Sequence, residues 1–328
     1  MSIRTPKVTV VIPAYNRAVA VRRAIQSVLA QTCQDFEIIV VDDGSTDSTV
    51  AAVTAIGDPR VVILRHERNL GAAPARNTGI RAGSAPYVAF LDSDDEWFTT
   101  RLEKLLSVFE RSGDHVGMVY TGAERILVDG TVVKDIPRER DDLSHALLTT
   151  NVVGGTSVAM VRRHVFEVVG AFDEALRYTE ELDLWLRISE RFAIRCIPEV
   201  LVRIAQQTIR GRLSGDVVAV SNGREMFCRK HRQKLINHRV LHLFLRESGW
   251  VQQRDARNLY EARRFYLKSI AARPLAPLTY VLALIACFPL AWQDGAARIK
   301  HHIEAWLPSS PMARAIPEDI SDVLDHVP

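Results

Sequence analysis

The sequence predicts an α/β protein whose mainly parallel sheet is flanked by helices, with a helical appendage at its C-terminal end. Three observations support this prediction. Strand-like and helix-like patterns alternate over about the first 120 residues, the strand-like segments are apolar on both faces, and the pattern after about residue 210 is helical. A chain of 328 residues, 47% of them hydrophobic, can form one large domain and a smaller one.

Several short, β-rich segments are predicted to be strands. Each is apolar and ends in turn-forming or polar residues, as expected of buried parallel strands. The segments are 8–15, 36–43, 60–66, 86–92 and 117–127, with an edge-like strand at 193–204. Because helical segments separate most of them, the strands are expected to form βαβ units.

Amphipathic patterns predict the helices that connect these strands. Apolar residues recur at helical spacing from Ala18 to Leu29, a capping Ser or Thr with an early acid begins a helix within 45–56, and glycines bound another at 71–83. Further helices are expected at 101–110 and from about Thr179. In such open sheets ligands bind beyond the carboxyl ends of the strands, so we expect one crevice there.

The chain is expected to divide into a domain at 1–210, a helical region at 211–306 and a flexible, acidic tail at 307–328. The uncharged segment 274–292 approaches the length of a membrane span but contains three prolines. A packing helix is the first interpretation. A peripheral membrane contact through 252–292, where a basic helix precedes the apolar segment, is the second, and a full crossing is the third.

Composition and cysteine spacing limit the classes of binding partner and the cellular compartment that we expect. The formal net charge of +3 is too small to indicate nucleic acid as a partner. The four cysteines stand singly, which favours neither a zinc site nor a disulfide framework and fits a reducing compartment. The N-terminal segment lacks a signal-peptide pattern. We therefore expect a cytoplasmic protein, and we include the inner face of the cell membrane in the expected location.

Four acids follow the fourth predicted strand within the stretch FLDSDDEW. Asp92 and Asp94 share a side in an extended stretch, and converging carboxylates are costly unless a cation neutralises them. Mn²⁺ or Mg²⁺ suits such oxygen ligands and commonly bridges to phosphates. The alternative is a solvated acidic turn before a helix. We prefer the metal for Asp92 and Asp94, and the helix start for Glu96.

The ends of the first two strands carry residues suited to a nucleotide. Asp42 and Asp43 can accept hydrogen bonds from a ribose or a base edge, although DDGS is also an ordinary turn sequence. Tyr15 offers a flat ring for stacking, after Pro13 directs the strand exit. Each motif alone is weak.

Charged residues also mark two predicted helices. Arg76 can reach a phosphate with its fork of donors, or it can pair with a local acid on the helix surface. Glu180, Glu181 and Asp183 stand in a first helical turn, where acids are favoured by capping alone. One of them can serve as a general base, but spacing does not select which.

In order along the chain, these motifs strongly resemble a family 2 glycosyltransferase with the GT-A fold. The resemblance covers roughly residues 7–200 and runs through VTVVIPAYNR, VVDDGSTDST, NLGAAPARNTGI, YVAFLDSDDEW and EELDLWLRI. It implies a nucleotide-binding half at about 7–125 and an acceptor half at about 126–210. It also implies transfer of a sugar from a nucleotide-sugar donor, preferably a UDP-sugar, to a hydroxyl of a glycan or lipid-linked acceptor, with inversion.

The resemblance assigns roles to individual positions. It implies a nucleotide-sugar site made of Pro13, Ala14, Tyr15, Arg17, Asp42, Asp43, Arg76, Asp92 and Ser93. It implies a divalent metal on Asp94, with Asp92 beside it and Asp95 assisting indirectly. The implied base is Glu181, where the family usually has the Asp of a Glu-Asp pair. Because that residue is a Glu here, Glu180 and Asp183 remain alternatives.

Other functions are weighed against this one. A non-catalytic nucleotide-sugar-binding relative is the main alternative, supported by the unusual Glu-Glu pair. A haloacid-dehalogenase-like phosphatase also places D-x-D after a strand, but it wants Thr or Val where Glu96 stands. No Q-x-x-R-W motif follows Glu181, so a single addition is favoured over processive synthesis.

Overall fold

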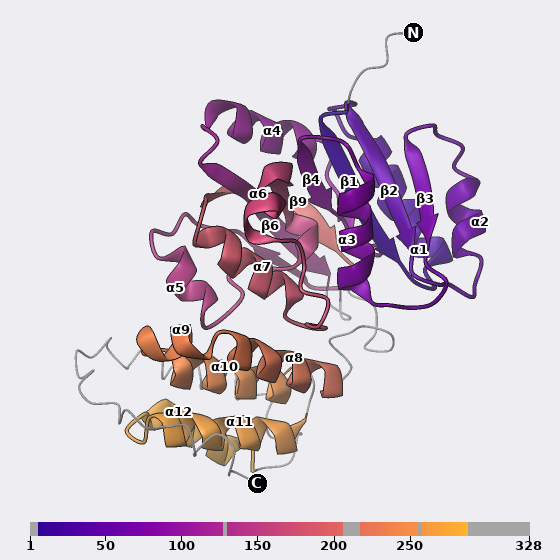
Figure 1. The fold of residues 1–328 in the computed structure, drawn as a ribbon. Helices are drawn as coiled ribbons and strands as arrows, with labels where there is room; N and C mark the ends of the chain where they lie inside the picture. The colour runs from indigo at the N-terminus through magenta and orange to yellow at the C-terminus, as the bar shows by residue number, and fades with distance from the viewer. Residues whose placement is uncertain (1–5, 127–129, 206–216, 255–257, 288–328) are drawn as a thin grey trace. The chain divides into compact units, whose positions relative to one another are not determined.

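The computed structural model describes residues 6–126, 130–205, 217–254 and 258–287 (Figure 1). The chain divides into two compact units, the first made of residues 1–144 and 151–208 and the second of residues 145–150 and 209–328.

The first unit is built on a mixed sheet. Its strands are β1 (Val8–Ala14), β2 (Phe36–Asp42), β3 (Val61–Arg65), β4 (Tyr87–Phe90), β5 (Glu96–Trp97), β6 (Val116–Ile126), β7 (Val132–Asp135), β8 (Ala159–Arg162) and β9 (Ala193–Ile204). They are ordered β3-β2-β1-β4-β8-β6-β9-β5, with β7 paired to β6. The strands from β3 to β4 are parallel, as predicted, whereas β8 is antiparallel to both of its neighbours.

Helices pack on this sheet and connect its strands. They are α1 (Ala18–Leu29), α2 (Thr49–Thr54), α3 (Ala72–Ala82), α4 (Arg101–Arg111), α6 (Arg163–Val169) and α7 (Glu180–Ser189), with a 3₁₀ turn at Thr156–Val158 and α5 (Leu143–Leu147) where the chain passes between the units. Helix α3 lies very close to β1 (Figure 1), because a Cβ on Gly79 would stand 2.3 Å from Val11 Cγ1. That close contact fixes the helix that carries Arg76.

Two predictions about this unit are wrong in detail. The segment 193–204 is not an edge strand, because β9 lies between β6 and the two-residue β5, which is too short to show a sequence pattern. Glu96 does not begin a helix. It pairs with Arg203 inside β5, and α4 starts only at Arg101.

The second unit is helical. It contains α8 (Val217–Lys230), α9 (Arg232–Asn237), α10 (Leu241–Arg254), α11 (Leu259–Ala272) and α12 (Pro277–Ile285). Trp250 of α10 and Tyr266 of α11 form a core with Leu278 and Leu282 of α12. This burial supports the interpretation of the apolar segment as a packing helix.

The described part of 274–292 ends at residue 287, and the predicted tail at 307–328 lies outside the described residues. Among the helices that the structure describes, none combines the length and the apolar character needed to cross a membrane.

Candidate active site

The parallel strands β2, β1 and β4 bring their carboxyl ends together, as predicted. Ala14 pairs in register with Asp42, and the next backbone N–H, of Asp43, donates to the Ala14 carbonyl at 2.8 Å. On the other side of β1, the amide of Leu91 donates to the carbonyl of Val11 at 3.0 Å, so β4 ends alongside β1 just before Asp92. The predicted acids therefore stand on neighbouring strand ends.

The loop after β1 is tied to the loop after β2. Asn16 has a φ of 51°, in the left-handed region, and its Oδ1 accepts a hydrogen bond from the Thr46 amide at 2.9 Å. The amide of Arg17, at the start of α1, donates to Thr49 Oγ1 at 2.8 Å. Between Pro13–Ala14 and this anchored turn, the Tyr15 side chain is 43% exposed. Its ring is available for stacking.

Asp42 and Gly44 shape the end of β2. Asp42 is fully buried, its Oδ2 lies 3.2 Å from Arg65 Nε, and its Oδ1 has no hydrogen-bond partner. Gly44 has a φ of 76°, and a Cβ there would stand 2.6 Å from the backbone of Arg68. The glycine is needed for this turn, and one buried carboxylate oxygen beside it remains unsatisfied.

Asp43 binds groups of the protein itself. Its Oδ1 accepts from the Leu70 amide at 3.0 Å and its Oδ2 from the Gly71 amide at 2.8 Å. His66 Nδ1 lies 2.7 Å from Oδ1, and the other ring nitrogen lies 3.0 Å from Thr78 Oγ1. Asp43 is 3% exposed, and its carboxylate stabilises the loop that leads into α3. His66 was not predicted. Its position directly after β3 was the available signal.

Arg76 is the central cation of the site. It is 6% exposed, and its Nη2 donates to Asp92 Oδ1 at 2.8 Å while its Nη1 donates to Glu180 Oε1 at 3.0 Å. The guanidinium also lies 5.5 Å from the ring centre of Phe172. Burial alone would lower the pKa of Arg76, but Asp92 and Glu180 raise it above its usual value. Arg76 therefore joins the end of β4 to the start of α7.

The acids after β4 are held by hydroxyl groups. Asp92 Oδ1 accepts from Thr156 Oγ1 at 3.1 Å, and the Asp92 amide donates to Ser157 Oγ at 3.0 Å. The Ser157 hydroxyl donates in turn to Asp95 Oδ2 at 2.6 Å. Ser93, between the acids, is buried. Asp95 is 5% exposed, and burial, followed by the charges of Asp92 and Asp94, raises its pKa well above the usual range.

The donor set after β4 fits a hard divalent cation. Asp92 and Asp94 are partly exposed carboxylates, and burial, followed by the negative charges of these two acids, raises the pKa of Asp95. In the part of the chain that the structure describes, no three His, Cys, Asp or Glu side chains are grouped so that they could hold an ion. A cation here would need further oxygen ligands, as Mg²⁺ does when it binds one or two carboxylates together with substrate phosphates.

The three acids at the start of α7 have different surroundings. Glu180 is buried against Arg76, and its Oε2 has no hydrogen-bond partner. Asp183 is fully buried and forms an ion pair with Arg187 Nε at 2.8 Å. Glu181 is partly exposed and lies 3.4 Å from Asn151 Nδ2. Burial, and next the charge of Glu180, raise the pKa of Glu181 to about 8.

A glycine- and hydroxyl-rich segment, residues 151–158, supports both acid groups. Asn151 contacts Glu181, Thr156 and Ser157 hold the acids after β4, and the carbonyl of Gly154 accepts from Trp185 Nε1 at 3.2 Å. Sequence reasoning missed this segment. Its NVVGGTS sequence, with two glycines followed by two hydroxyl residues as in a turn, was the signal that could have identified it.

Comparison with known proteins identifies the family to which this chain is similar. A family model described as glycosyl transferase family 2 matches residues 9–170. The β-1,3-glucosyltransferase WfgD of Escherichia coli is 31% identical over 181 residues, which are 55% of this chain and 69% of WfgD. The succinoglycan biosynthesis protein ExoO of Rhizobium meliloti is 34% identical over 54% of each chain. A glycosyltransferase of Rickettsia prowazekii is 32% identical, and the matched region spans 64% of that relative's length.

Solved structures show the fold. Residues 1–349 of Staphylococcus aureus TarS match with a TM-score of 0.58 at 16% identity, over 89% of this chain and 91% of that one. The mannosyltransferase PcManGT of Pyrobaculum calidifontis matches with a TM-score of 0.58 at 20% identity, over 93% of this chain and 88% of that one. The phosphatase alternative is wrong. The chain belongs to glycosyl transferase family 2, and its first unit has the GT-A fold.

Proposed function

We propose that the protein is a metal-dependent hexosyltransferase that moves one sugar at a time from a nucleotide-diphosphate sugar to an acceptor hydroxyl, with inversion. The observation that carries the proposal is the row of charges Asp92–Arg76–Glu180 with Glu181 beside it. It places acids suited to a cation and an acid suited to proton transfer around a single guanidinium.

The donor site in this proposal uses the predicted strand ends within about residues 7–125. Tyr15 stacks on the base, the buried Asp42 and Asp43 shape the pocket, and Arg76 faces the phosphates. A UDP-sugar remains our preferred donor. Support comes from the solved relatives, because TarS was determined with UDP and with UDP-GlcNAc, and PcManGT with GDP-Man and Mn²⁺.

In this proposal Asp94 and Asp92 hold Mn²⁺ or Mg²⁺, and Asp95 assists through Ser157. When bound, the cation neutralises the departing diphosphate. The chain's own contribution is to keep Asp92 in place. Arg76, Thr156 and the hydroxyl of Ser157 restrain that residue from three directions.

Glu181 is the proposed base, and it takes the proton from the acceptor hydroxyl as the hydroxyl attacks. Its pKa of about 8, raised by burial and by Glu180, makes it a stronger base than an ordinary carboxylate. Accepting the proton also removes its repulsion with Glu180. Asp183 is a poorer candidate, because Arg187 already binds it in a buried ion pair. Inversion follows from this single displacement.

The acceptor is proposed to be a cell-surface glycan or its lipid-linked precursor, bound by the half at about 126–210. WfgD is named for a GlcNAc-diphosphoundecaprenol acceptor, which supports a lipid-linked substrate class. A cytoplasmic protein that meets the inner face of the membrane through 252–292 would suit such an acceptor. Tyr260 and Leu267 of α11 and Leu284 of α12 are exposed and apolar.

The test is a panel of UDP-, GDP- and dTDP-sugars, each with and without Mn²⁺. We expect one donor to raise the Tm in a metal-dependent way and to be slowly hydrolysed. Stabilisation without hydrolysis or transfer would favour the non-catalytic nucleotide-sugar-binding alternative. The absence of any metal-dependent effect across the panel would contradict the proposed function.

A further inference from the structure

The turn at residues 151–154 lies against α7, the helix that carries the proposed base. Its first residue, Asn151, forms two hydrogen bonds with Gly154. The Gly154 amide donates to Asn151 Oδ1 at 2.9 Å, and Asn151 Nδ2 donates to the Gly154 carbonyl at 3.0 Å. Gly154 has a φ of 102°, which residues with a side chain rarely adopt. Both ends of the Asn151 amide are therefore fixed to the backbone of the turn.

These two bonds determine which end of the Asn151 amide faces Glu181. The oxygen binds an N–H group and the nitrogen binds a carbonyl, so exchanging the two would bring donor against donor and acceptor against acceptor. The second hydrogen of Nδ2 remains for another acceptor. Glu181 Oε1 lies 3.4 Å from Nδ2. Asn151 therefore presents a donor, and not its oxygen, to the carboxylate.

Helix α7 contacts the same turn a second time. Trp185 stands four residues after Glu181, so the two side chains lie on one face of the helix. Trp185 is fully buried, and its Nε1 donates to the Gly154 carbonyl at 3.2 Å. Helix and turn are thus held together at two points, and the position of Asn151 beside Glu181 does not depend on one side-chain contact.

Glu181 has a use for this donor, because burial and two neighbouring acids disfavour its charge. Burial, and next the charge of Glu180, raise the pKa of Glu181, and Asp92 acts in the same direction, whereas a backbone amide and Arg76 act to lower it. A hydrogen bond donated to an ionised carboxylate favours the ionised form. A base must be in that form before it can accept a proton.

We propose that Asn151 is a positioning residue for the base, whose amide orients the Glu181 carboxylate and stabilises its ionised form. This inference rests on the proposed function of Glu181. Asn151 acts through its Nδ2–H group and does not exchange a proton itself. An asparagine that only formed the turn would stabilise residues 151–154 without affecting the charge of Glu181, so the two explanations differ in a measurable property of Glu181.

The first measurement follows the Glu181 carboxylate and needs no turnover. In full-length protein labelled with carbon-13 at the glutamate carboxyl groups, the NMR signal of Glu181 is the one that Glu181→Gln removes. Asn151→Leu keeps a branched side chain without a donor, and it should raise the titration midpoint by about half a pH unit to one unit. Asn151→Asp keeps an acceptor for the Gly154 amide and should raise the midpoint further, because a carboxylate would then face Glu181.

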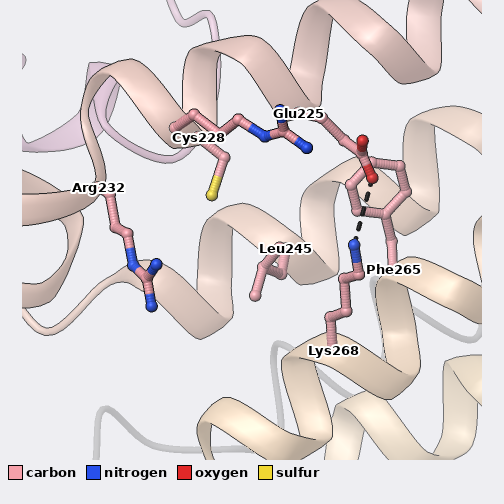
Figure 2. A pocket seen from close by; sticks show the side chains of 7 residues that line it. Glu225, Cys228, Arg232, Leu245, Phe265 and Lys268 are labelled. Atoms are coloured by element: carbon pink, nitrogen blue, oxygen red, sulfur yellow. Dashed lines mark hydrogen bonds and ion pairs between the residues drawn. The ribbon is translucent and has the colours of Figure 1, made fainter. Parts of the chain in front are cut away.

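Glu225→Gln is the control for a lost side-chain contact in the second unit. Glu225 Oε1 lies 3.2 Å from Lys268 Nζ, and Figure 2 shows this ion pair between α8 and α11. Glu225→Gln weakens the ion pair and removes one glutamate signal, but the midpoint of Glu181 should keep its wild-type value. An unchanged or lowered midpoint in both Asn151 variants would overturn the proposal.

The second measurement separates this inference from the proposed function. At pH 7, Asn151→Leu should lower kcat for transfer about three- to tenfold, because that much less of the base is ionised, and it should leave the donor KM unchanged. A normal transfer rate in Glu181→Gln would contradict the proposed base, and the inference with it. Transfer that collapses in Glu181→Gln but keeps its wild-type rate and pH profile in Asn151→Leu would overturn the inference alone.

Discussion

Two groups of carboxylates lie at the carboxyl edge of the same sheet, and they differ in what compensates them. At the end of β2, Asp43 receives two backbone N–H groups and faces His66, all from the protein itself. At the end of β4, burial, followed by the charges of Asp92 and Asp94, raises the pKa of Asp95. The first group is largely satisfied by the protein. In the second group, Asp92 is paired with Arg76, and three acids stand close together along the chain.

The difference separates two roles that look alike in the sequence. A carboxylate that accepts several internal hydrogen bonds stabilises its loop, whereas crowded acids raise one another's pKa and gain most from a cation or a proton. Glu181 belongs to the second kind, because Glu180 is held beside it by Arg76. The predictions below test this distinction, beginning with the largest expected effect.

Glu181→Gln should lower the rate of sugar transfer by about 100- to 10,000-fold, because a general base is lost while the shape is kept. Donor binding, measured by calorimetry with Mn²⁺, should be unchanged. A transfer rate near that of the wild type would place the base elsewhere, with Glu180 as the first alternative.

Arg76→Met should lower the free energy of unfolding by about 3–5 kcal/mol, since it leaves the buried Glu180 without its partner. Chemical denaturation measures this loss. Lys7→Met is the matched control. It breaks an exposed pair with Glu110 and should cost about 1 kcal/mol or less. Equal losses in the two variants would mean that Arg76 does not neutralise the site.

Asp94→Ala should lower metal-dependent donor turnover by about 100- to 1,000-fold, through loss of charge stabilisation at the leaving group. The Tm of this variant without metal should not fall, because removing the negative charge of Asp94 reduces the electrostatic repulsion on Asp95. Undiminished turnover at low Mn²⁺ would remove Asp94 from the metal site.

Asp43→Asn should produce the smallest effect, about 1–3 kcal/mol of stability, because the amide can accept fewer of the hydrogen bonds that hold residues 66–71. Thermal unfolding measures the change. A loss of transfer without a loss of stability would show that Asp43 serves the donor more than the loop.

Sequence reasoning predicted the fold, and it predicted which acids stand at the strand ends, because both depend on local patterns. Parallel strands that end in polar residues bring those residues to one edge, so Asp42 and Asp92 could be placed from periodicity alone. The pair between Arg76 and Glu180 could not be predicted. It joins residues 104 positions apart, and no local pattern encodes that contact.

Long-range packing also explains the remaining differences. β9 is internal because the two-residue strand β5 pairs with it. A segment of two residues is too short to show the alternation of apolar and polar residues that predicts a strand. The hydroxyl groups of the segment 151–158 hydrogen-bond to Asp92. These contacts join distant parts of the chain, so the sequence alone does not reveal them. The charge balance around Glu181 depends on the same contacts.

The most direct test of this account is the pH dependence of kcat/KM for transfer, compared in wild type and Glu181→Asp. The base must be ionised to accept a proton, and its pKa is raised to about 8, so activity should rise with pH and level off above about 8. In Glu181→Asp the rise should persist, but its midpoint should move. A profile that is flat between pH 6 and pH 9, or identical in the two proteins, would contradict the assignment of Glu181 as the base.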